Sequence, residues 1–248
     1  NAMLIWGFHM GVAGAALATL ISRVFCAVVV LAQLRQDRQP IVVRDYLKIR
    51  PDFRMIRRIL SIGIPSGVEN SMFQLGKVLV LSLVSTFGTY AIAANAVSNV
   101  ITLFSILPGQ AICLAVTTVI ARCVGAGDYE QAKYYNKKLI LLTHIGMAIT
   151  IFIVFITLPF ILKVYNLSEA ASEATRHIIW FHGFCAILIW AESFTLPATF
   201  RACGDAKACM IISTVSMWIF RVGASYILGK NLGLGVFGVW VAMIIDWA

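Results

Sequence analysis

The residues of this sequence that could do chemistry are a few ionisable side chains inside long apolar tracts. Glu69 lies ten residues into the tract 59–87, a depth of about 15 Å at the 1.5 Å rise per residue of an α-helix. A charge so deep in a membrane costs several kcal/mol unless it is paired or hydrated, so Glu69 is a candidate site for a proton or a cation. Pro65, one turn earlier, lacks an N–H and is expected to break the helix and free a carbonyl. The alternative is that Glu69 forms a structural ion pair with a neighbouring Lys or Arg.

Two polar stripes recur at helical spacing in neighbouring tracts. The first consists of Asn70, Gln74 and Lys77, and the second of Asn95, Asn99 and Thr102. In lipid, such stripes must face protein or water. They either form hydrogen bonds between helices or line a cavity for a substrate. We expect the Lys77 ammonium to pair with a carboxylate that the sequence does not identify.

A second acid, Glu192, stands in the tract 178–200, and Arg221 stands in the next tract, 208–228. Counted from Gly204 in the connecting loop, Glu192 is 12 residues back and Arg221 is 17 residues on. Their heights along antiparallel helices therefore differ by roughly 7 Å, a gap that an Arg side chain can span. We predict a structural Glu192–Arg221 ion pair, with a proton or cation site at Glu192 as the alternative.

Nothing in the residue types and spacings indicates an enzyme. The four histidines and six cysteines show no metal-ligand spacing, and no glycine-rich nucleotide-binding pattern follows a strand. No nucleophile stands beside a base in the sequence pattern. We therefore expect no catalytic residue, no bound metal and no organic cofactor.

The tracts that hold these residues predict an all-α, polytopic transmembrane helical bundle. The chain is 60% apolar and 12% charged, whereas soluble domains are roughly a quarter charged. Six tracts reach the length of about 20 residues that a membrane-spanning helix needs, namely 11–34, 59–87, 91–121, 139–164, 178–200 and 208–228. A seventh, 235–248, is too short to span, and residues 3–10 resemble the end of another helix. We expect both to be truncated transmembrane helices.

The basic residues predict the orientation and the domain boundaries. The loop 35–58 holds eight Lys or Arg, the loop after the third tract four and the loop after the fifth tract two, while the opposite side holds three. By the positive-inside rule the three basic loops are cytoplasmic. The net charge of +9 then indicates anionic lipids, and no nucleic acid, as the partner of the basic loop. We divide the chain into 1–10, 11–34, the loop 35–58 and a lobe at 59–248.

A weak internal repeat suggests a larger parent. Five of 13 positions match between 11–23 and 235–247, at an offset of 224 residues. Parallel repeats are one of the two layouts of secondary transporters. The repeat predicts a two-lobe protein of twelve helices, of which this chain holds about half.

Several stretches together resemble the multidrug and toxic compound extrusion (MATE) family. They are GVAGAALATLISR (11–23), ILSIGIPSGVENSMFQLGK (59–77), FGTYAIAANAVSN (87–99), LPGQAICLAVTTVIARCVGAGDYEQAK (107–133), SFTLPATFRACGDAK (193–207), SMWIFRVGASYILG (216–229) and GVWVAMIIDW (238–247). The resemblance implies the C-terminal half of an antiporter in the plasma (inner) membrane. It would export organic cations and other drugs in exchange for Na⁺ or H⁺, together with the missing N-terminal lobe. A lipid or lipid-linked oligosaccharide flippase of related architecture is the alternative.

The sequence departs from the family's Na⁺-linked members at two positions. Where those members carry an acid in the helix after the Ile-Pro motif, this chain has Phe73, and Glu69 lies one turn earlier. The acid expected twelve residues before Arg201 is Ile189 here, and Glu192 lies about one turn further on. The family's cation site therefore does not transfer residue by residue, and Glu69 and Glu192 remain the ion-coupling candidates.

Overall fold

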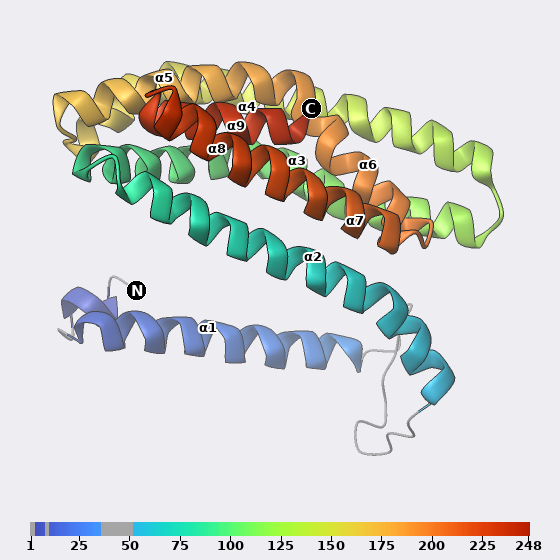
Figure 1. The fold of residues 1–248 in the computed structure, drawn as a ribbon. Coiled ribbons are helices and arrows are strands. Elements are labelled where there is room, and N and C mark those ends of the chain that lie inside the picture. Colours follow the sequence, from blue (N-terminus) through green and yellow to red (C-terminus); the bar gives the residue numbers. More distant parts are fainter. Residues whose placement is uncertain (1–2, 8–9, 36–51) are drawn as a thin grey trace. The chain divides into compact units, whose positions relative to one another are not determined.

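The computed structural model describes residues 3–7, 10–35 and 52–248, and the regular elements in these ranges are helices (Figure 1). Unit 1, Asn1–Ile56, and unit 2, Arg57–Ala248, are separate compact units. Unit 1 contains the short π-helical segment η1 (Met3–Gly7) and α1 (Gly11–Leu34). Unit 2 holds almost all the remaining helices, and its long helices run roughly along one common axis (Figure 1).

Three long helices open unit 2, and two interrupted ones follow. The uninterrupted helices are α2 (Phe53–Ser85), which begins just before the unit boundary, α3 (Thr89–Gly125) and α4 (Tyr129–Tyr165). The first interrupted helix is built from α5 (Glu169–Cys185), the π-helical η2 (Ala186–Trp190) and α6 (Ala191–Ala202). The second is built from α7 (Ala206–Ser216), η3 (Met217–Gly223), α8 (Ala224–Tyr226) and η4 (Ile227–Asn231), and α9 (Gly235–Trp247) follows it.

This fold is a helical transmembrane bundle, as the composition predicts. In the described ranges, five helical segments are long and apolar enough to cross a membrane: 11–34, 89–125, 129–165, 169–202 and 206–231. The helix predicted over 59–87 is present within α2. The charged and amide side chains in its middle turns lower its hydropathy, so α2 is not among the five and its span stays a prediction.

The helices extend further into the connections than the apolar tracts indicate, because capping side chains begin them among polar residues. Asp128 Oδ1 accepts a hydrogen bond from the Gln131 N–H at 2.9 Å, so α4 begins ten residues before its apolar tract. Asp52 Oδ1 likewise accepts from the Arg54 and Met55 N–H groups, at 2.9 and 3.2 Å. The predicted C-terminal boundary of the loop 35–58 is therefore wrong, since residues 53–58 belong to α2. Residues 36–51 of that loop lie outside the described residues.

Helix α3 forms the centre of unit 2 and packs against α4, α5 and α6. Small residues permit close approach between helices at two places in unit 2. A Cβ on Gly109 would overlap the buried Trp190 ring, and a Cβ on Gly183 would overlap the Phe155 ring. Both glycines therefore let an aromatic ring pack directly on a helix backbone.

Helix α2 is held to unit 2 mainly through its second half. Leu83 and Val84 join a buried cluster with Trp240 of α9, and Gly76 meets the methyl group of Met217 in η3. The helix continues through Pro65, so this residue lies within α2 and does not end it.

Candidate functional site

A cavity of about 760 Å³ lies within unit 2, between α2, α3, the α5–η2–α6 helix, η3 and α9. Its aromatic lining consists of Phe73, Trp190, Phe194, Trp240 and Trp247. Its polar lining consists of Lys77, Asn95, Asn99, Thr102, Gln110, Cys113, Thr117, His182, Arg201 and Arg221. A cavity of this size with an apolar wall and a few polar groups is typical of sites for small organic molecules.

The two predicted stripes contribute unequally to this cavity. Lys77 and the whole second stripe (Asn95, Asn99 and Thr102) line it, whereas Asn70 and Gln74 do not. Asn70 donates a hydrogen bond to the Ser66 carbonyl of its own helix at 2.9 Å. The second stripe both lines the cavity and forms a hydrogen bond between helices. Asn95, which lines the cavity, accepts a hydrogen bond from Trp240 of α9.

Lys77 does not meet the carboxylate that we expected. In the described part of the chain, no carboxylate lies within ion-pair distance of its ammonium group. Glu69 and Asp246 are instead bound to the arginines that line the cavity, Arg201 and Arg221.

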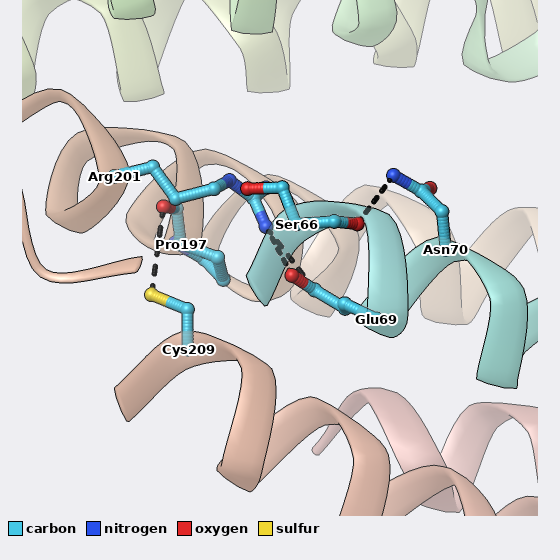
Figure 2. Close-up of polar contacts among 6 residues, drawn as sticks. All are labelled: Ser66, Glu69, Asn70, Pro197, Arg201 and Cys209. Atoms are coloured by element: carbon cyan, nitrogen blue, oxygen red, sulfur yellow. Dashed lines mark hydrogen bonds and ion pairs between the residues drawn. The ribbon is translucent and has the colours of Figure 1, made fainter. Parts of the chain in front are cut away.

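Glu69 is bound to Arg201, which joins α2 to α6 (Figure 2). The Arg201 Nη1 atom donates to both carboxylate oxygens, at 3.1 Å to Oε1 and 3.0 Å to Oε2. Glu69 is 9% exposed. Beside this pair, the Cys209 thiol lies 3.7 Å from the Pro197 carbonyl oxygen (Figure 2). The structural ion pair that we considered for Glu69 is thus present, and a cation at Glu69 would have to compete with Arg201.

Glu192 does not pair with Arg221, so that prediction was wrong. Its Oε1 atom lies 2.9 Å from Nε2 of His144 in α4, and Nδ1 of His144 lies 2.7 Å from the Ile187 carbonyl oxygen. Height along the helix was a poor guide, because the pairing also depends on which face a side chain occupies. Segments η2 and η3 have i→i+5 turns, so a face counted with 3.6 residues per turn is displaced after each of them.

The contact between His144 and Glu192 requires a proton between the ring and the carboxyl group. A carbonyl only accepts hydrogen bonds, so Nδ1 of His144 must carry a hydrogen toward Ile187. A hydrogen bond between Nε2 and Oε1 then requires a second proton, on the imidazole or on the carboxyl group. Without that proton, two acceptors would face each other at 2.9 Å. The contact between α4 and α6 therefore depends on protonation.

Arg221 pairs instead with Asp246 of α9, at 3.0 Å between Nε and Oδ2. Both side chains are buried, with exposed fractions of 9% and 4%. The Nε–H is not aimed at the oxygen, so the contact is an attraction between charges more than a hydrogen bond. Ser216 donates to the other carboxylate oxygen at 2.8 Å, and the Arg221 guanidinium lies 5.4 Å from the Phe73 ring centre.

Three partners in this site were missed by sequence reasoning: His144, Arg201 and Asp246. Each is an ionisable residue inside or beside an apolar tract, and that was the available signal. The bonds to Glu69 and Glu192 join residues 132 and 48 positions apart, so helix spacing alone does not reveal them.

Comparisons with known proteins agree with this architecture. The model of the MatE family matches residues 65–227, which is most of unit 2. The chain belongs to the MatE family. Among curated relatives, the probable multidrug resistance protein YoeA of Bacillus subtilis is 26% identical over 242 residues, covering 96% of this chain and 52% of the relative. The probable multidrug resistance protein NorM of Thermotoga maritima is also 26% identical, covering 97% of this chain and 52% of the relative.

Solved structures give the same fold. The outward-facing conformation of a multidrug resistance MATE family transporter of the MOP superfamily matches with a TM-score of 0.87 and 20% identity, covering 99% of this chain and 55% of that chain. A MOP superfamily transporter from Pyrococcus furiosus matches with the same TM-score, identity and coverage. The chain therefore spans about half the length of the MatE relatives that it matches. Their names place them among multidrug transporters and do not favour the flippase alternative.

Proposed function

We propose that this MatE chain forms one lobe of a secondary antiporter that exports amphipathic organic compounds across the plasma (inner) membrane. The observation that carries the proposal is the cavity of about 760 Å³ inside a membrane-spanning helical bundle. Because the relatives are about twice as long, the second lobe is expected from the other half of the same protein. Transport would then alternate access to the space between the lobes, and this chain alone would transport nothing.

We further propose that the coupling ion is a proton and that His144 and Glu192 bind it. The support is the hydrogen-bond geometry, which joins α4 to α6 only while one proton lies between Nε2 and Oε1. Glu192 is 48% exposed and His144 is 27% exposed, so neither group is sealed inside the packed helices. Glu69 is the weaker candidate, because Arg201 already engages both of its oxygens. Gain or loss of the proton would favour different states of the lobe, which is what coupling requires.

The test is proton-driven efflux of a fluorescent drug from cells that express the complete transporter containing this chain. Glu192→Gln and His144→Gln should each reduce efflux under an imposed pH gradient at least tenfold at matched expression. Glu69→Gln is the matched control, since it removes an equivalent carboxylate that holds a structural ion pair. It should lower thermal stability and leave the efflux per folded molecule within about twofold.

Three results would contradict parts of this proposal. Wild-type efflux by Glu192→Gln, with loss in Glu69→Gln, would assign coupling to Glu69. Efflux that follows an imposed Na⁺ gradient and ignores the pH gradient would exclude the proton. Efflux from cells that express residues 1–248 alone would show that the second lobe is not needed.

A further inference from the structure

We propose that the cavity of unit 2 selects amphipathic organic anions, with a flat apolar body and one negative group such as a carboxylate or sulfonate. This substrate class rests on the proposed export function and replaces the organic cation implied by the family resemblance. Four independent features of the lining support it: its charge, its hydrogen-bonding groups, the placement of its cations and its aromatic rings.

The charge of the wall is positive. Among the described residues that line the cavity, Lys77, Arg201 and Arg221 are cationic and none is Asp or Glu. Two carboxylates behind the wall neutralise the arginines, Glu69 at Arg201 and Asp246 at Arg221. Lys77 keeps its charge without a carboxylate in the described ranges. Within the described lining of this chain, a cationic substrate would therefore meet an uncompensated ammonium group and no free carboxylate.

The lining also presents donors where an anion needs them. Trp240 Nε1 can only donate, and it bonds to Asn95 Oδ1 at 3.1 Å, so the Asn95 amide NH₂ remains for a ligand. The terminal nitrogens of Arg221 make no hydrogen bond within the described part of the chain, and this residue lines the cavity. Arginine offers a fork of N–H groups that matches a carboxylate.

Two of the cations, Lys77 and Arg221, lie on the side of the cavity that Phe73 of α2 lines. Phe73 and Lys77 are four residues apart and share a face of the helix, and both line the cavity. The Arg221 guanidinium lies over the Phe73 ring at 5.4 Å. One corner of the cavity therefore brings together an unpaired ammonium and a guanidinium. Because Asp246 already balances the Arg221 charge, the corner carries the net charge of Lys77, which an added anion compensates and an added cation increases.

The remaining wall fits an apolar aromatic body. Trp190 stacks on Phe194 with ring centres 4.7 Å apart, and Phe194 meets the Trp247 ring edge-on at 5.7 Å. Trp240 completes this side of the lining. Rings of this kind also attract cations, through their electron-rich faces. The Lys77 ammonium decides between the two, because a full charge without a counter-charge repels a cation more strongly than a ring face attracts it.

The test compares two ligands that share one ring system and differ in charge. Isothermal titration calorimetry would measure the binding of 1-naphthaleneacetate and of 1-naphthylmethylammonium to the complete transporter containing this chain, in detergent at pH 7. The anion should bind at least tenfold more tightly, and raising the salt concentration should reduce this preference. Lys77→Met should abolish the preference, and Lys77→Arg should retain it. Lys230→Met removes an exposed lysine of η4 that does not line the cavity, and it should change neither affinity.

Equal or tighter binding of the cation, or binding of neither ligand, would overturn the proposed substrate class. An anion preference that survives Lys77→Met would place the ligand elsewhere. If Lys77→Met does not fold, the wild-type comparison and Lys77→Arg still decide. Proton-driven efflux is measured separately, so efflux without an anion preference would refute this inference alone. An anion preference without efflux would refute the export function and leave the site.

Discussion

Replacing Asp246 by Asn tests whether the buried pair with Arg221 holds α9 in place. The substitution keeps the shape of the side chain, and its amide oxygen can still accept from Ser216. It removes the negative charge from a contact whose partners are 9% and 4% exposed. The Arg221 charge would then remain inside the lobe with no counter-charge.

Breaking a buried ion pair on one side costs about 3–5 kcal/mol, because the surviving charge stays out of water. The lower end applies here, since the Arg221 Nε–H is not aimed at the carboxylate and can turn toward the cavity. We therefore expect Asp246→Asn to lower the free energy of unfolding by about 3 kcal/mol. For a unit of this size, that corresponds to a fall in melting temperature of roughly 6–12 °C.

Thermal unfolding of the purified chain in detergent, followed by tryptophan fluorescence, measures this change. Glu130→Gln is the matched control, because it breaks an ion pair with Lys133 whose side chains are 85% and 70% exposed. Water and salt screen such an exposed pair, so its loss should leave the melting temperature nearly unchanged. The double variant Asp246→Asn/Arg221→Met should recover most of the loss. If Asp246→Asn unfolds like Glu130→Gln, the reasoning about the buried charge is refuted.

Three further predictions follow from the packing, the caps and the topology. Gly109→Ala should cost about 1–3 kcal/mol, because its methyl group overlaps the buried Trp190 ring, and an unchanged melting temperature would show that the ring can move aside. Asp128→Ala should cost about 1 kcal/mol through loss of its bond to the Gln131 N–H at 2.9 Å, measured by the same unfolding assay. In the complete transporter, with Cys203 as the only cysteine, a membrane-impermeant maleimide should label this exposed thiol after permeabilisation and not in intact cells. Labelling of intact cells would reverse the predicted orientation.

The sequence predicts the helices well because apolar tracts of membrane length have few alternatives to a helix. The predicted helix 11–34 has the bounds of α1, since the apolar tract ends at Arg35. Boundaries were missed where a capping side chain extends a helix beyond its apolar tract, as Asp128 does for α4. There the local hydrogen bond, and not hydrophobicity, sets the first turn.

The sequence identified several residues of the candidate site, but it did not identify which ionisable residues pair with one another. Lys77, Asn95, Asn99 and Thr102 line the cavity, which is one of the two roles that their helical spacing predicted. The partner of Glu192 could not be derived, because it depends on the rotation of α4 against α6 and on the π-helical segment η2 between α5 and α6. An ideal helical wheel carries no information on such a segment.

The bond between Glu69 and Arg201 also constrains how the protein is made. The two residues are 132 positions apart, so a ribosome adding about 5–20 residues per second completes Arg201 roughly 7–26 s after Glu69. During that interval the nascent α2 carries an acid whose final partner does not yet exist. Water, the insertion machinery or an earlier part of the chain has to stabilise the carboxylate until α6 arrives. Final docking of α2 must therefore wait for α6, which makes the assembly of this lobe a late step in its synthesis.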